Sequence, residues 1–257
     1  MALNLYSAVD FAREVLRVEQ IAPSDVEDRS GTVVNGRTVR ATIYGNDRGC
    51  GPAVSFGQVL ENADGSVLVA IRGTSDIFEW LLDAEFLQVR CGFLPGRIEY
   101  GFKTIYDTLR AVCPGFSGPL KYFPWLYQRP TTIAGHSLGG ALATLTAADV
   151  AVYARGSGSI NKFSAYTYAS PRVGDPEFVA AYEKLGIESH RIENPGDRVP
   201  EVPNFGYEHV GEPFYLTDWK ARSTFCKHHL TTYLHLMTLT LYDGEESKVF
   251  PLDGDCV

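Results

Sequence analysis

The sequence predicts a single α/β domain in which a mostly parallel, mixed sheet is flanked by helices on both faces. Three observations predict this class. Strand-like and helix-like runs alternate between residues 131 and 193, as parallel strands joined by helices do. Two hairpin signals precede them and predict antiparallel strands at one side of the sheet. No stretch of the 257 residues has the composition and length of a linker, so one large core is expected.

The first elements are a helix and two hairpins. Residues 4–20 carry apolar side chains at helical spacing, which predicts an amphipathic helix. Asn35-Gly36 is a strong hairpin signal between strands at 32–34 and 37–44. A turn at 63–65 joins strands at 53–60 and 66–71. Further elements in this half are a helix at 100–112 and the aromatic, proline-rich stretch 115–130, which has no clear assignment.

The second half alternates strands with helices. Strands are predicted at 131–134, 162–169 and 189–193, and helices at 141–154 and 176–185. Residues 207–216 carry further strand signal, and 228–241 predicts a helix. The catalytic groups of such sheets gather at the carboxyl ends of the parallel strands, so the loops after these strands are the places to search.

The net charge, the hydropathy pattern and the cysteine content limit which binding partners, membrane segments and metal sites are expected. The net charge of −8 argues against nucleic acid and against tight binding to anionic membranes. No run of 18 apolar residues occurs, so no transmembrane segment is expected. The first residues lack the features of a signal peptide, so we expect a protein secreted with its signal removed or a cytoplasmic one. The five cysteines show no metal-ligand spacing; we expect free buried thiols, and the count also allows one disulfide.

The most informative motif is Gly135-His136-Ser137-Leu138-Gly139, which lies between the strand at 131–134 and the helix at 141–154. This strand–turn–helix context is what a nucleophile elbow requires, because the sharp turn lifts the serine hydroxyl above the sheet edge. A phosphate-binding loop would end in Gly-Lys-Ser or Gly-Lys-Thr, which is absent here. The motif therefore predicts a serine hydrolase with Ser137 as its nucleophile.

A serine needs a base within hydrogen-bond reach and an acid that orients the base. Asp197 is the best-placed acid, because it lies in a turn directly after the strand at 189–193. Other carboxylates considered are Asp175, which fits a helix N-cap better, Glu193 and Asp218. The base is expected among His209, His228, His229 and His235. His228 and His229 lie on a loop or the first turn at the start of the helix at 228–241 and are free to reach the serine, but their spacing does not distinguish them.

Four blocks of residues resemble the class 3 lipases, a family of fungal triacylglycerol lipases and feruloyl esterases with plant and bacterial relatives. The blocks are AIRGTS at 70–75, GHSLGG at 135–140, YASPRVGD at 168–175 and RIENPGDRVP at 191–200, in the order of the family. The resemblance implies an α/β-hydrolase fold with Ser137 as nucleophile and Asp197 as acid. It implies His228 as base through the spacing to Tyr233, whereas the fungal pattern favours His229.

The oxyanion hole and the lid follow from the same comparison. One oxyanion donor is the backbone N–H of the residue after the nucleophile, Leu138. The resemblance places the second at Thr74. Residues 76–88 follow directly, and their apolar side chains suit either a buried helix or the lid that covers the active site in this family. The predicted lid and acyl-binding residues are Ile77, Phe78, Trp80 and Leu81.

Together these features predict a lipase that cleaves acylglycerols or other medium- to long-chain esters through an acyl-enzyme. A lid at 76–88 would make it act at an oil–water interface. The partner is then an ester or lipid substrate, with no nucleic acid, no metal and no organic cofactor. We expect a monomer or a weak oligomer. The alternatives are a feruloyl or short-chain esterase, and a catalytically silent, lipase-like binding module.

Overall fold

The computed structural model describes residues 2–47, 49, 51–74, 86–217 and 223–256. Their centre is a mixed sheet with the strand order β12-β11-β10-β9-β4-β3-β2-β7-β8, and β1 pairs with β2 outside this path. β4, β9, β10, β11 and β12 run parallel to their neighbours on that side, whereas β3, β2, β7 and β8 continue it antiparallel. The expected mixed α/β sheet, with antiparallel strands at one side, is confirmed.

The strands of the parallel half are those that lead to the site. They are β4 (Val67–Ile71), β9 (Thr131–His136), β10 (Phe163–Tyr168), β11 (Glu188–Glu193) and β12 (Pro213–Tyr215). Those of the antiparallel half are β1 (Val33–Val34), β2 (Arg37–Gly45), β3 (Val54–Glu61), β7 (Arg110–Cys113) and β8 (Phe116–Pro119). A separate hairpin pairs β5 (Gln88–Arg90) with β6 (Arg97–Glu99).

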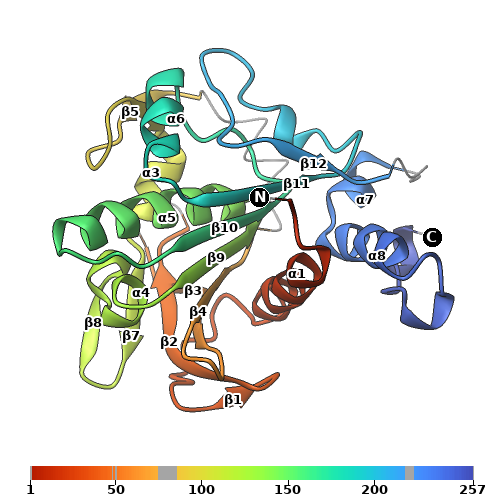
Figure 1. Cartoon of the computed structure of the whole chain (residues 1–257), viewed down its shortest axis with the longest axis horizontal. Helices are drawn as coiled ribbons and strands as arrows, with labels where there is room; N and C mark the ends of the chain where they lie inside the picture. The colour runs from red at the N-terminus through yellow and green to blue at the C-terminus, as the bar shows by residue number, and fades with distance from the viewer. Residues whose placement is uncertain (1, 48, 50, 75–85, 218–222, 257) are drawn as a thin grey trace.

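Helices cover both faces of the sheet, as Figure 1 shows. One face carries α3 (Tyr100–Tyr106), α4 (Pro124–Tyr127), α5 (Leu138–Gly156) and α6 (Pro176–Glu183). The other face carries α1 (Leu5–Glu19) and α8 (Leu230–Leu241), and the short helix α7 (Thr224–His228) precedes α8. Strand β4 shows how the sequence divides the core, because Val67, Val69 and Ile71 face one cluster while Leu68 and Ala70 face the other.

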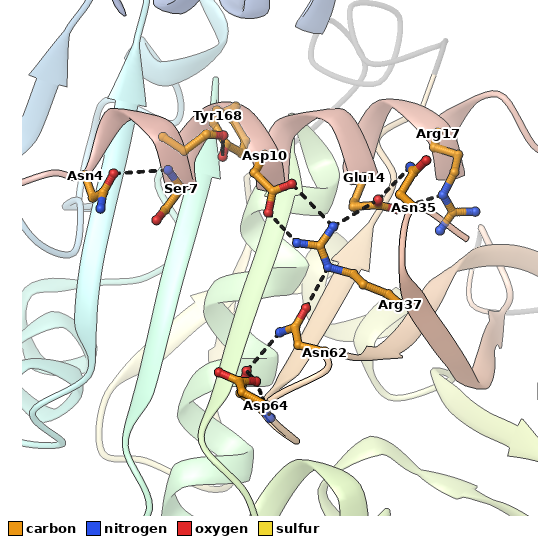
Figure 2. A network of polar contacts seen from close by, with 12 residues as sticks. Asn4, Ser7, Asp10, Glu14, Arg17, Asn35, Arg37, Asn62, Asp64 and Tyr168 are labelled. Carbon is orange, nitrogen blue, oxygen red and sulfur yellow. Dashed lines mark hydrogen bonds and ion pairs between the residues drawn. The ribbon is translucent and has the colours of Figure 1, made fainter. Parts of the chain in front are cut away.

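Helix α1 is held on the sheet by a polar network as well as by its apolar face (Figure 2). The Arg37 guanidinium pairs with Asp10 and with Glu14, which it meets at 3.2 Å. Glu14 also accepts from Asn35 at 2.8 Å and pairs with Arg17 at 2.8 Å. The network thus connects the middle of α1 to the β1–β2 hairpin.

Three sequence-based predictions differ from the structure. The helix expected at 100–112 ends at Tyr106, because the Thr108 hydroxyl bonds back to the Ile105 carbonyl at 2.7 Å and residues 110–113 pair with β2 instead. The strand signal at 207–216 yields only β12, while Glu208 forms an isolated bridge to Gly174. The helix expected at 228–241 is split by His229, whose extended backbone (φ −60°, ψ 135°) separates α7 from α8.

Candidate active site

Ser137 occupies a sharp turn between β9 and α5. Its backbone has φ 57° and ψ −126°, a conformation that side-chain-bearing residues rarely adopt and that marks a strained functional position. The turn closes so tightly that a Cβ on Gly135 would lie 2.0 Å from the carbonyl oxygen of Gly139. The glycines of the motif are therefore required by the close approach of strand and helix, and the expected elbow geometry is present.

Three side chains that are far apart in the sequence meet at this turn. Nε2 of His228 lies 2.9 Å from Oγ of Ser137. Nδ1 of His228 lies 2.9 Å from Oδ2 and 3.1 Å from Oδ1 of Asp197. Because a carboxylate only accepts, Nδ1 carries the hydrogen, and Nε2 of the neutral ring is left to accept the serine proton. This is the arrangement of a Ser-His-Asp triad.

Asp197 is fixed by three elements. It follows β11 in the predicted turn, and its side chain is completely buried. Oδ1 accepts the Val199 backbone N–H at 3.0 Å, and Oδ2 accepts the Tyr233 hydroxyl at 2.8 Å. These two donors fix the orientation of the carboxylate, so that it faces Nδ1 of His228. The tyrosine that the family comparison used to choose His228 thus contacts the carboxylate that orients this histidine.

The structure distinguishes the two adjacent histidines. His228 ends α7 and is buried, while His229 lies in the break before α8 and is directed to Asp253, with Nδ1 3.2 Å from Oδ2. Burial lowers the pKa of His228 below its ordinary value, and the opposing hydrogen bond and charge of Asp197 do not fully offset this effect. His228 is therefore a neutral imidazole at neutral pH, the form that a general base requires.

The other acid and base candidates have structural contacts away from Ser137. Asp175 caps α6, accepting the Phe178 N–H at 2.8 Å. His209 meets the Pro200 carbonyl at 2.8 Å, and burial lowers its pKa to about 3. Two further candidates are Glu193, which pairs with Arg191, and His235, which meets the Phe250 carbonyl at 2.8 Å. Asp218 lies outside the described residues.

The expected oxyanion donors flank the elbow. Leu138 begins α5, where helical amides have no acceptor within the helix. Thr74 lies in the loop after β4, and this loop packs on the elbow so closely that a Cβ on Gly139 would lie 2.5 Å from the Arg72 carbonyl oxygen. Thr74 and His228 both line a cavity of about 300 Å³, together with Arg72, His136, His229 and Asp253. The expected lid residues Ile77, Phe78, Trp80 and Leu81 lie outside the described residues.

A disulfide lies beside the histidine segment. Cys226 in α7 is joined to Cys256, 30 residues later. The structure thus contains the one disulfide that the cysteine count allowed, while Cys91 and Cys113 are free thiols among the described residues. The bond attaches the C-terminal segment two residues before His228, a connection that no spacing in the sequence indicated.

The fold and the elbow are those of an α/β-hydrolase. A model of the family Lipase (class 3) matches residues 68–207, more than half of the chain, so the chain belongs to the class 3 lipase family. No helix in the described part of the chain is long and apolar enough to cross a membrane.

Relatives with assigned names are similar to this chain over part of their length. A lipase of Rhizomucor miehei is 33% identical over 61% of this chain and 43% of that protein. Secreted mono- and diacylglycerol lipase 1 of Fusarium solani is 30% identical over 75% of this chain and 53% of that protein. The chain thus spans about half the length of these curated relatives. The crystal structure of a mono- and diacylglycerol lipase from Aspergillus oryzae shares the fold, with a TM-score of 0.64 and 22% identity over 85% of this chain and 82% of that one.

Proposed function

We propose that this protein is a carboxylic ester hydrolase, a lipase that cleaves acylglycerols or other medium- to long-chain esters. The observation that carries the proposal is the unbroken line of hydrogen bonds from Asp197 through His228 to the strained Ser137. The sheet that extends through most of the described chain supports treating it as one domain. The relatives from Rhizomucor miehei and Fusarium solani are both named as lipases, which supports the same class of substrate.

The reaction follows from the positions of the hydrogens. His228 removes the proton from Ser137 as Oγ attacks the ester carbonyl, and the tetrahedral intermediate collapses when His228 returns this proton to the leaving alcohol. Water then enters and loses a proton to His228 as it attacks the acyl-enzyme, and His228 returns this proton to Oγ of Ser137 as the bond to the fatty acid breaks. Asp197 remains ionised throughout and stabilises the imidazolium that forms in each step.

The negative charge on the carbonyl oxygen needs donors that are in place before the reaction. We assign the backbone N–H of Leu138 and the Thr74 residue to this task. Leu138 follows Ser137 directly, and the residue before Thr74 lies so close to the elbow that a Cβ on Gly73 would be 3.2 Å from Cβ of Ser137. Removal of one such donor costs about 2.7–4 kcal/mol of transition-state stabilisation. A Thr74→Ala substitution should therefore reduce kcat by roughly 10²–10³-fold if the hydroxyl is the donor, and leave it near wild type if only the backbone acts.

Covalent labelling with a fluorophosphonate tests the triad directly. The wild-type protein should be labelled, and Ser137→Ala should not be. His228→Ala should slow the labelling by several orders of magnitude, whereas His229→Ala is the matched control and should label at nearly the wild-type rate. A wild-type protein that resists the probe is a silent binding module, and equal rates for the two histidine variants would remove His228 from its role.

Parallel assays define the substrate. We expect p-nitrophenyl palmitate to be cleaved with a higher kcat/KM than p-nitrophenyl acetate or methyl ferulate. The reverse order would make the protein a short-chain or feruloyl esterase. If residues 76–88 form an interfacial lid, the initial rate should rise sharply at the solubility limit of the ester, while smooth saturation would argue against it.

A further inference from the structure

Glu19, the last residue of α1, contacts two segments of the site at once. Its Oε1 lies 2.9 Å from Nδ1 of His136 and accepts the Gly73 backbone N–H at 3.0 Å. Nε2 of His136 in turn lies 2.8 Å from the carbonyl oxygen of His228. One carboxylate therefore connects α1 to the loop after β4, to the elbow, and through His136 to the backbone of the histidine that faces Ser137.

The contacts of His136 fix its charge. Both ring nitrogens face atoms that accept hydrogen bonds, a carboxylate on one side and a carbonyl on the other, so both carry hydrogen and the ring is an imidazolium. Burial favours the neutral His136, but the charge and hydrogen bond of Glu19 raise its pKa above the ordinary value. Burial likewise favours the neutral Glu19, but His136, the Gly73 N–H and Arg72 hold its pKa below the ordinary value.

The positive charge on His136 lies close to the ring of His228. The ring of His136 lies 4.9 Å from that of His228, centroid to centroid, and 6.2 Å from the ring of Tyr233 in α8. Asp197 acts on His136 at longer range. Burial is the main cause that lowers the pKa of His228, and the positive charge on His136 lowers it further, while Asp197 and Glu19 oppose both.

We propose that Glu19 is a positioning residue: its ion pair with His136 holds the loop after β4 and the His228 backbone on the elbow, and keeps a positive charge beside the catalytic imidazole. The inference rests on the proposed esterase function. The pair connects the three segments that supply the nucleophile, the base and the oxyanion donor. A shift of about 1 Å in any of them can cost roughly 10²-fold in rate, so one shared anchor controls the geometry of all three.

Glu19→Gln tests the proposal, because it removes the charge and retains the shape. We expect kcat on a p-nitrophenyl ester to fall roughly 10- to 100-fold while KM changes little. Once Glu19 no longer holds the proton on His136, the positive charge beside His228 is lost. The acid limb of the kcat/KM profile should then move to higher pH, a change that mere loosening of the fold would not produce.

Glu14→Gln is the matched control. Glu14 lies on the same helix, is buried and is ion-paired with Arg17 and Arg37 (Figure 2), and neither arginine lines the cavity beside His228. It should lower the melting temperature and leave kcat and the pH profile unchanged well below that temperature. An equal loss of kcat in both variants would show that any weakening of α1 has this effect, and would overturn the assignment of Glu19.

The charge can also be measured in the unaltered protein, whether or not Glu19→Gln folds. Long-range ¹H–¹⁵N correlation spectra at neutral pH should show a doubly protonated imidazole that is assigned to His136 by its loss in His136→Asn. A neutral His136 would overturn the inference, as would an active wild type whose kcat is unaffected by Glu19→Gln. A wild type that neither labels with fluorophosphonate nor cleaves any ester refutes the proposed function itself.

Discussion

The Tyr233 hydroxyl contacts Asp197 and can be removed by a single substitution that leaves Asp197 itself unchanged. It donates to Asp197 at 2.8 Å, accepts the Asn194 backbone N–H at 3.1 Å and is fully buried. Tyr233→Phe removes both bonds and leaves a buried N–H without this acceptor. A hydrogen bond to a charged group contributes about 1.5–3 kcal/mol and an unpaired buried amide costs about 1–3 kcal/mol. We therefore expect the free energy of unfolding to fall by about 4 kcal/mol.

Thermal and urea unfolding measure this loss, which corresponds to a melting temperature lower by about 8–16 °C for a chain of this size. The freed carboxylate should also reduce kcat roughly tenfold, because His228 is held less firmly. Tyr182→Phe is the control: this buried tyrosine of α6 meets only the neutral Ser189 hydroxyl, at 3.0 Å, so about 1 kcal/mol and no change in kcat are expected. A Tyr233→Phe loss no larger than that of the control would refute the reasoning.

Three further predictions concern pH and the disulfide. Because burial lowers the pKa of His228 below its ordinary 6.5 and the neutral ring is active, kcat/KM should persist as the pH falls through 6.5; an acid midpoint above 6.5 would contradict this. The unfolded chain protonates His209 near 6.5 but the folded chain only at about 3, so this residue makes stability fall between these values as the pH is lowered. His209→Gln should flatten that decline in urea titrations, and an unchanged slope would argue against it. Replacing both Cys226 and Cys256 by Ser should lower the unfolding free energy by about 3–4 kcal/mol, as expected for a loop closed over 30 residues. Chemical denaturation under non-reducing conditions measures this loss, and a much smaller loss would contradict the prediction.

Local signals predicted the elements whose conformation is set locally. Asn35 and Gly36 both have positive φ, as the two-residue hairpin requires, and the strands on either side of them follow. The helix predicted at 100–112 is too long because its end is set by a distant contact. Helical spacing continues past Tyr106, but pairing with β2 recruits residues 110–113 into the sheet, and this long-range contact leaves no mark on the local pattern.

The residues of the site also differ in whether the local sequence predicts them. Ser137 and Asp197 occupy turns that the local sequence predicts, because glycines lie on both sides of Ser137 and a Pro-Gly pair precedes Asp197. His228 and His229 are adjacent, so only the backbone break between α7 and α8 separates them, directing one to Asp197 and the other to Asp253. The break lies within residues 228–241, a stretch whose sequence predicts a single helix.

Glu19 shows the limit of local reasoning most clearly. It is the last residue of an amphipathic helix, a place where a carboxylate is ordinarily solvated and is disfavoured by the helix dipole. Its partner His136 follows 117 residues later, and α1 brings the two together because it packs on the face of the sheet over β4 and β9. Neither partner alone predicts the ion pair, since a carboxylate near a helix end and a histidine beside a nucleophile each suit many folds. The polar network at Arg37 holds α1 on the β1–β2 hairpin through Asp10 and Glu14, separately from the ion pair of Glu19, so the two anchors of the helix can be tested one at a time.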